Sequence, residues 1–407
     1  MAEHSKKIMI VGAGIAGLCT GVYARKCGFD VEIVEMGNSS GGLAMSWQRQ
    51  GYTFETCIYW LLGSNPTSPY YSLWKEVFDI QKINFIDSEE IAHIETEDGL
   101  RLVIKRNIDE MEHELLRIAP EDRAAITRVA QGIRKIMNCE LPLTSGGPLT
   151  NLIGLLRMIP YLPEIRFWSK MTTEQLGNRF KHPLLRHFFG GNESPQMSAA
   201  TRIFSLAWMC NRDAGYPIGG SQALIKLIEQ NFRDLGGKIL FNAKVDRILV
   251  ENDKAVGVRL SDQSEIRGDW VVSAADGHAT LFEWVPDRYR DEKAEKPYRN
   301  LPVFPSYLQV SLGVKRDLRQ EPAYLTRILN TPLKLDPGSE LKELSIRFFH
   351  FDPTFAPAGK TAVTCFLPTY NYDYWVNLHK TDPASYADRK QEVASKVRNA
   401  RTKTCGY

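Results

Sequence analysis

The stretch Ile8-Met-Ile-Val-Gly-Ala-Gly-Ile-Ala-Gly17 joins a short apolar run to three glycines spaced as G-x-G-x-x-G. A helical stretch follows from Leu18 to Lys26, and Gly28 suits a left-handed helix end. A second apolar run, Val31 to Val34, ends in Glu35, about 20 residues beyond the middle glycine. Strand, glycine turn, helix, second strand and terminal acid together predict a dinucleotide-binding βαβ unit.

Each residue type in this unit has a physical reason. Gly12 allows the tight turn, Gly14 lets the backbone approach a pyrophosphate, and Gly17 lets the helix and strand pack closely. The phosphate charge then lies at the helix N-terminus. The Glu35 carboxylate accepts hydrogen bonds from ribose hydroxyls and would repel a 2′-phosphate, which disfavours NADP. The predicted binding residues of this unit are Gly12, Gly14, Ile15, Ala16, Gly17 and Glu35.

A glycine pair shortly after Glu35 bears on the choice between FAD and NAD. Gly41 and Gly42, followed by Leu43, would let a second backbone loop approach an extended cofactor. That favours FAD, which continues from its pyrophosphate into ribityl and isoalloxazine. An ordinary polar turn is the alternative interpretation.

A second glycine-rich stretch, Gly215 to Ser221, precedes a helical pattern from Gln222 to Leu235. The apolar runs Lys238 to Phe241, Val245 to Val250 and Ala255 to Leu260 follow, separated by polar turns. Their spacing predicts a β-meander.

The stretch Trp270 to Asp276 is predicted to close this meander as a buried strand that ends in small residues. Ala274 and Ala275 would leave room for a cofactor beside the sheet. Small residues are also common where a strand meets a loop, so both interpretations stay open.

Taken together, these pieces resemble the flavin-dependent phytoene desaturase and retinol saturase-like family, within the amine-oxidase-type flavoprotein fold. The matching stretches are Ile8 to Glu35, Ser40 to Gly63 and Tyr216 to Thr280, and the similarity in character extends to about residue 380. The resemblance implies an α/β fold: a Rossmann-like FAD-binding domain, with a parallel sheet and a β-meander, built from discontinuous segments, and an inserted α+β substrate domain. The expected division is 1–105 and 211–290 for FAD binding, 106–210 for a helix-rich substrate or lid insert, 291–380 for a substrate-domain sheet, and 381–407 for a terminal helix and tail.

The resemblance also implies roles for single positions. It assigns the glycines of the first motif to the pyrophosphate and Glu35 to the adenosine ribose. It places Gly41-Gly42, with Leu43 beside them, along the ribityl side. Val245 would bind the adenine through its backbone, and Ala274-Ala275 would lie close to that end of FAD.

Three departures from the family pattern are visible. Related sequences often have Arg after the glycine pair, where this chain has Leu43. They often have Asp-x-Gly followed by His, where this chain reads Glu55-Thr-Cys-Ile-Tyr59. The family's late Gly/Pro-rich return to the flavin is not found after Lys380, where one helix, Pro383 to Arg398, is expected. We therefore expect a C-terminally truncated chain that binds FAD poorly.

Flavin chemistry needs no protein nucleophile, and no catalytic residue can be assigned from the sequence. The leading hypothesis is an FAD-dependent oxidoreductase that desaturates or saturates carbon–carbon bonds of an apolar isoprenoid-, carotenoid- or retinoid-like small molecule. The alternatives are a flavin amine oxidase-type enzyme and a non-catalytic, prenyl-binding escort-like protein. The intact Gly12, Gly14, Gly17 and Glu35 favour the enzyme.

Composition and residue spacing also bear on nucleic-acid binding, metal binding, cellular setting and membrane contact. A net charge of +3 without a Lys/Arg block argues against nucleic acid, and the seven scattered cysteines indicate a reducing, cytoplasmic setting. No His or Cys spacing suggests a metal. The apolar stretch Leu149 to Trp168 is either an interfacial membrane contact or a substrate-domain core or lid. The aromatic, strand-like region 302–375 is expected to wall a substrate cavity, with strands at Tyr307 to Val314, Leu344 to Phe351 and Thr361 to Leu367.

Overall fold

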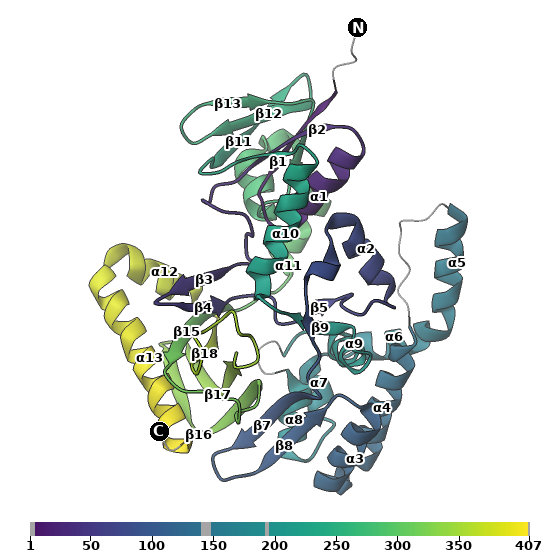
Figure 1. Ribbon diagram of the computed structural model, residues 1–407, viewed down its shortest axis with the longest axis vertical. Helices are drawn as coiled ribbons and strands as arrows, with labels where there is room; N and C mark the ends of the chain where they lie inside the picture. The colour runs from purple at the N-terminus through teal and green to yellow at the C-terminus, as the bar shows by residue number, and fades with distance from the viewer. Residues whose placement is uncertain (1–4, 140–147, 192–194, 406–407) are drawn as a thin grey trace.

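A parallel sheet forms the centre of the upper lobe in Figure 1. The computed structural model describes residues 5–139, 148–191 and 195–405. Within them the sheet has the strand order β10-β2-β1-β14, and all neighbouring strands are parallel. The helices α1 (Ile15–Lys26) and α10 (Gly220–Asp234) pack on it through a shared apolar core that includes Leu18 and Phe232. The strands are β1 (Lys7–Val11), β2 (Asp30–Val34), β10 (Lys238–Leu240) and β14 (Trp270–Ser273).

The structure confirms the predicted strand–turn–helix–strand unit but corrects the meander. Lys238 to Phe241 was predicted as a meander strand, whereas β10 pairs in parallel with β2. A strand that follows a helix returns alongside the sheet, so parallel pairing is favoured. Trp270 to Asp276 likewise does not close the meander, because β14 pairs in parallel with β1. The meander is β11 (Val245–Glu251), β12 (Lys254–Leu260) and β13 (Glu265–Arg267), and its short third strand was not predicted.

The lower lobe contains a second, larger sheet with the strand order β15-β18-β17-β16-β7-β8. It draws β7 and β8 from the first segment of the chain, and β7 pairs in parallel with β16. The long strand β16 had not been predicted, whereas the strands at 307–314 and 361–367 are confirmed. The bounds are β7 (Glu90–Thr96), β8 (Arg101–Lys105), β15 (Ser306–Val314), β16 (Tyr324–Asp336), β17 (Ser339–Phe348) and β18 (Thr361–Thr369).

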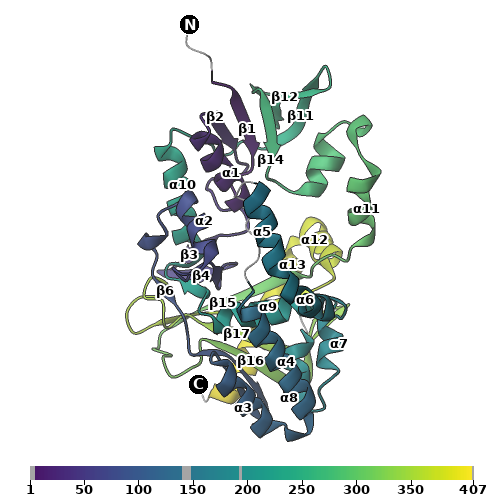
Figure 2. The ribbon, with the colours of Figure 1, turned by 90° about the vertical axis from the view of Figure 1, so that its right-hand side faces the viewer.

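Helices cover one side of this sheet and form the largest apolar core of the described chain. They lie mostly in the segment predicted as a helix-rich insert, and Trp168 and Phe189 are among the fully buried side chains of this core. Figure 1 shows α5 (Pro148–Met158) at the right-hand edge of the molecule, and Figure 2, which faces that side, draws it across the middle at the height where the two lobes meet. The other helices of this group are α3 (Ile108–Ile118), α4 (Arg123–Met137), α6 (Leu162–Ser169), α7 (Thr173–Gly177), α8 (Pro183–Gly190) and α9 (Ala199–Cys210).

Short elements connect the lobes. Two small sheets, β3-β4 and β5-β9-β6, lie between the large ones, and α12 and α13 pack against the far side of the lower sheet (Figure 1). The helix expected at 383–398 is present as part of α13. In the part of the chain that is described, no helix combines the length and apolar character needed to cross a bilayer. The bounds are β3 (Ser46–Arg49), β4 (Tyr52–Glu55), β5 (Leu61–Leu62), β6 (Phe85–Ile86), β9 (Ala214–Pro217), α2 (Pro69–Val77), α11 (Glu292–Asn300), α12 (Tyr372–Thr381) and α13 (Pro383–Cys405).

Candidate active site

The glycine turn before α1 is built for close backbone approach. Gly12 has a φ of +99°, in the left-handed region that favours glycine. A Cβ on Gly17 would lie 1.9 Å from the carbonyl oxygen of Gly12, so only glycine fits there. Gly14 caps α1 without a side-chain hydrogen bond, and the first turn of the helix holds no acidic residue. The first turn of the helix thus supplies no anion of its own, and the N–H groups at its start are suited to a phosphate.

The second glycine pair lies directly beside this turn. The Gly41 N–H donates to the Ala13 carbonyl oxygen at 2.9 Å, and Gly14 forms a β-bridge with Gly41. A Cβ on Gly42 would lie 3.2 Å from the Gly14 Cα. Leu43, which follows, is 90% exposed. The structure thus brings the two predicted glycine motifs together, as an extended dinucleotide would require.

Glu35 lies at the end of β2 with its carboxylate almost completely buried. One oxygen accepts the Ala13 N–H and the other accepts the Gly37 N–H, both at 2.7 Å. A carboxylate has about four lone-pair sites, so acceptor capacity remains for ribose hydroxyls. The side chain is fixed by backbone donors of two loops, the turn before α1 and the segment after β2, and it fits the ribose role.

Two further predicted cofactor residues, Val245 and Ala274, lie beside Glu35 and the Gly12 turn. The Ala243 N–H donates to the Glu35 carbonyl oxygen at 2.9 Å, which brings Val245, the buried first residue of β11, to this edge. Ala274 donates its N–H to Val11 at 2.9 Å. A Cβ on Gly12 would lie 3.1 Å from the Ala274 carbonyl oxygen. The predicted set therefore gathers at one edge of the parallel sheet, and the cradle fits FAD.

A buried carboxylate that the sequence did not explain lies at the start of α10. Glu55 is 0% exposed, and its two oxygens accept the Ser221 N–H at 2.7 Å and the Ser221 hydroxyl at 2.6 Å. The N–H groups of Thr56 and Cys57 also donate to it, both at 2.9 Å. The residue that departs from the family pattern thus ties the segment after β4 to the second glycine-rich turn. No sequence signal links two positions so far apart in the chain.

Asp352 fixes the other side of that turn. Its carboxylate accepts the Tyr216 hydroxyl at 2.9 Å and the Gly219 N–H at 2.8 Å. Burial, followed by the negative charge of Asp352, raises the pKa of Tyr216, so the phenol keeps its proton and acts as the donor. Tyr216 also contacts Phe351 edge to face, at a ring-centroid distance of 5.0 Å.

A cavity of about 760 Å³ lies between the lower sheet and α9, within the range of small-molecule sites. Its wall is mainly apolar and aromatic, as expected from region 302–375. Tyr59 and Trp60, which follow Glu55, also line it. Further aromatic wall residues are Phe188, Tyr216, Phe304, Tyr307, Tyr324, Phe349 and Phe351.

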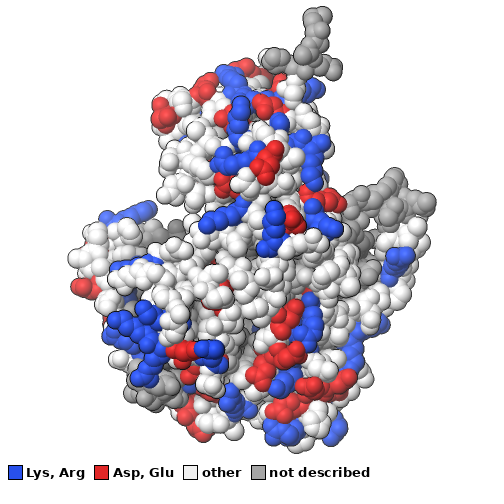
Figure 3. All heavy atoms as spheres, viewed as in Figure 1, with Lys and Arg blue, Asp and Glu red and all other residues white. Residues whose placement is uncertain are grey.

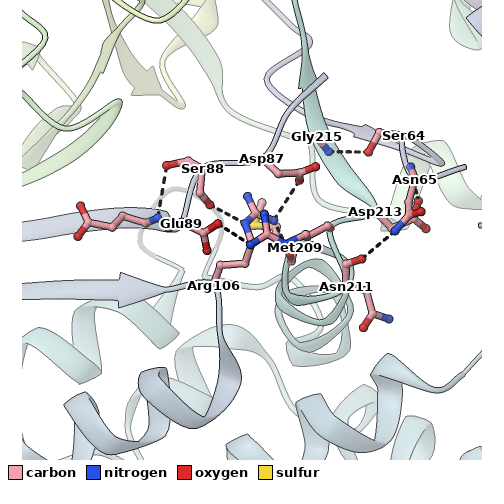
Figure 4. A network of polar contacts seen from close by, with 12 residues as sticks. Ser64, Asn65, Asp87, Ser88, Glu89, Arg106, Met209, Asn211, Asp213 and Gly215 are labelled. Atoms are coloured by element: carbon pink, nitrogen blue, oxygen red, sulfur yellow. Dashed lines mark hydrogen bonds and ion pairs between the residues drawn. The ribbon is translucent and has the colours of Figure 1, made fainter. Parts of the chain in front are cut away.

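One end of this wall is held by a buried arginine (Figure 4). Arg106, just after β8, donates to the carbonyl oxygens of Ser88, at 2.5 Å, and Met209. Its guanidinium also lies 3.2 Å from the Asp87 carboxylate. Burial raises the pKa of Asp87 and lowers that of Arg106, and the attraction between them opposes both shifts. This cluster joins β8 to the end of α9.

The neighbouring Asp213 fixes the next loop. Its carboxylate accepts the N–H groups of Gly63, at 3.1 Å, and Asn65, at 3.2 Å. It also accepts the Ser68 hydroxyl at 2.7 Å. Asp213 thus ties the loop between β5 and α2 to the residue that precedes β9.

The fold, the glycine cradle and the cavity are those of a flavin-dependent oxidoreductase. The chain belongs to the flavin containing amine oxidoreductase family, whose model matches residues 15–400. FAD is accordingly its cofactor, and the predicted α/β flavoprotein fold is confirmed.

The individual relatives agree with the resemblance to the phytoene desaturase and retinol saturase-like family. The chain is 26% identical to prolycopene isomerase 2 of an Oncidium hybrid cultivar over 96% of this chain and 68% of that protein. It is 26% identical to a neurosporene-forming phytoene desaturase of Rhodobacter capsulatus over 91% of this chain and 74% of that protein. It thus spans about two thirds to three quarters of their lengths. An oxidoreductase from Methanosarcina mazei has a similar fold, with a TM-score of 0.58, 19% identity, and coverage of 95% of this chain and 84% of that chain.

Proposed function

We propose that the chain acts on carbon–carbon bonds of an apolar, isoprenoid-like small molecule, by desaturation or saturation. The observation that carries this proposal is the cavity of about 760 Å³, walled largely by aromatic and aliphatic side chains, in a chain with an intact dinucleotide cradle. The names of the relatives, a phytoene desaturase and a prolycopene isomerase, support the same substrate class.

The protein's part in this chemistry is binding and orientation. Bound FAD supplies the hydride-accepting or hydride-donating ring. We propose that Gly12, Gly14, Ile15, Ala16 and Gly17 hold the pyrophosphate, that Glu35 holds the ribose, that Gly41, Gly42 and Leu43 follow the ribityl chain, and that Val245, Ala274 and Ala275 lie at the adenine end. The cavity then excludes water from an apolar substrate, whose burial supplies most of the binding free energy.

The division of the chain also remains a proposal. Segments 1–105 and 211–290 supply the cofactor half, and 106–210 and 291–380 supply the substrate half, with 381–407 at the end. The parallel sheet is assembled from the first two segments, which supports this division, while β7 and β8 of segment 1–105 extend the substrate-side sheet.

A spectroscopic experiment tests the proposed reaction. The FAD-loaded chain is mixed without oxygen with phytoene, a hydrocarbon, or with putrescine, an amine, and flavin bleaching is recorded. The photoreduced protein is mixed with the same compounds to detect reoxidation. We expect phytoene either to bleach the oxidised flavin or to reoxidise the photoreduced flavin. A response to the amine alone would overturn the substrate class.

We also propose that the segment 149–168 contacts a membrane surface through which an apolar substrate enters. The supporting observation is an exposed apolar row, Leu152, Leu155 and Leu156 on α5 and Ile159 directly after it, each 53–61% exposed. The edge at α5 shows white and blue atoms in Figure 3, and Arg157 is exposed beside the row. Apolar residues with a basic neighbour suit the interface of an anionic bilayer.

Vesicle flotation tests this contact. We expect the chain to float with phosphatidylcholine vesicles that contain phosphatidylserine, and Leu155→Glu to lower the bound fraction several-fold. Leu100→Glu, at a 47% exposed position between β7 and β8, is the matched control and should leave binding unchanged. No flotation with or without the anionic lipid would rule out the membrane contact.

A further inference from the structure

Arg347 brings a positive charge into the aromatic wall of the cavity. It lies on β17, directly opposite Tyr324 on β16. Its guanidinium carbon is 3.7 Å from the ring centroid of Tyr59 and 4.5 Å from that of Tyr324. All three side chains line the cavity. Stacking on tyrosine rings holds a guanidinium in place through its flat face.

The other cations of the wall have partners in the protein. Arg106 pairs with Asp87 at 3.2 Å, and His187 pairs with Glu343. Arg202, the remaining arginine of the wall, lies over the Phe188 ring at 5.4 Å and makes a further interaction.

Arg347 differs from these residues. Among the described residues, no Asp or Glu side chain pairs with it, and its recorded contacts are the two tyrosine rings. A half-buried guanidinium normally satisfies its charge with an acceptor. Because its face is used for stacking, its N–H donors remain along the edge of the plane.

His350 and Glu321 also line the cavity. The His350 ring nitrogen lies 2.9 Å from the backbone carbonyl oxygen of Glu321, which is a neutral acceptor. Burial lowers the pKa of His350, which leaves the ring neutral near neutral pH. The Glu321 side chain lines the same wall and carries the opposite charge to Arg347.

We propose that Arg347 binds the carboxylate of an amphipathic substrate whose apolar chain lies against the aromatic wall. A planar guanidinium with a free edge matches a carboxylate in two parallel N–H···O bonds. The same charge disfavours an amine at this position. This inference rests on the proposed function and narrows it to isoprenoid-like acids.

Ligand binding to the FAD-loaded chain tests the proposal. Retinoic acid and retinol serve as probes because they share one isoprenoid skeleton and differ in the carboxylate. Their affinities are measured from quenching of tryptophan fluorescence, at neutral pH, for the wild type and for Arg347→Gln, Arg347→Lys and Glu321→Gln.

We expect the wild type to bind the acid more tightly than the alcohol. Arg347→Gln should weaken the acid about 10- to 100-fold, as loss of a charge-assisted pair does, and change the alcohol less than about threefold. Arg347→Lys should be intermediate, because it keeps the charge but loses the planar fork. Glu321→Gln, the matched control on the same wall, should not weaken the acid.

The experiment distinguishes failure of the carboxylate role of Arg347 from failure of the proposed isoprenoid substrate class. Equal binding of acid and alcohol by the wild type, or equal weakening of both by Arg347→Gln, would overturn the carboxylate role and leave the isoprenoid substrate class standing. Binding of neither probe by the folded wild type would overturn both. Thermal unfolding of each variant checks that affinity is compared between folded proteins.

Discussion

Two helices of this protein begin in glycine-rich turns, and the two turns end differently. The N-terminus of α1 has no side-chain cap and no acidic residue in its first turn, and Glu35 binds the Ala13 N–H just before it. The N-terminus of α10 receives the buried carboxylate of Glu55, which binds Ser221 through both the N–H and the hydroxyl. One helix start is open to an external anion, and the other is filled by the protein's own anion. A glycine-rich helix start therefore indicates an anion site without showing which anion occupies it.

The largest expected effect is at the open turn. Gly17→Val should abolish FAD binding and cost about 4 kcal/mol or more of stability, because its Cβ would lie 1.9 Å from the Gly12 carbonyl oxygen. Flavin absorbance of the purified variant and urea unfolding measure the two effects.

Gly14→Ala is the informative control for this prediction. Its Cβ would approach the Gly41 oxygen only to 3.9 Å, and the φ of −71° at Gly14 suits any residue. We expect a change in stability of less than about 1 kcal/mol together with a large loss of FAD affinity. Full flavin content in Gly14→Ala would contradict the pyrophosphate role of this turn.

The next effect is at the filled turn. Glu55→Ala removes the acceptor for three backbone N–H groups and one hydroxyl in a fully buried site, so we expect a loss of about 3 kcal/mol in the free energy of unfolding. Ser221→Ala removes one of these donors and also the acceptor of the Ile58 N–H, at 3.1 Å, so it should cost about 2 kcal/mol.

Chemical rescue sharpens the same comparison. Acetate can replace the missing carboxylate, so it should raise the melting temperature of Glu55→Ala more than that of the wild type at matched ionic strength in chloride. Equal shifts in both proteins would show that the α10 turn does not function as an anion site.

The smallest of the three effects concerns Glu35. Glu35→Ala should weaken FAD about tenfold through loss of the ribose contacts, which corresponds to roughly 1.4 kcal/mol. It should also lower stability by about 1–2 kcal/mol, since Ala13 and Gly37 lose their acceptor. Titration of the apoprotein with FAD, followed by flavin fluorescence, measures the affinity. An unchanged affinity would remove Glu35 from the ribose site.

Much of the cofactor cradle was predictable because its signal is local. The strand, turn, helix and second strand that end at Glu35 follow one another without interruption, and backbone sterics restrict the glycine positions. The strand at 238–241 was assigned to the wrong sheet, because a short apolar run carries no information on its pairing partner. The strand β16 was missed, although Leu325, Thr326 and Arg327 near its start are buried. Its polar and charged residues hide the alternation that a half-buried strand would show.

The sequence by itself determined the βαβ unit, the flavin-type cofactor and the glycines of the turn before the first helix, because spacing along a continuous chain sets these features. Only the tertiary structure decided that Glu55 fills the second glycine turn, and that Tyr59, Tyr324 and Arg347 share one cavity wall. The Glu55–Ser221 and Tyr59–Arg347 contacts join segments more than a hundred residues apart. Their energies depend on which side chains meet after the sheets have paired, and no local pattern in the chain records that.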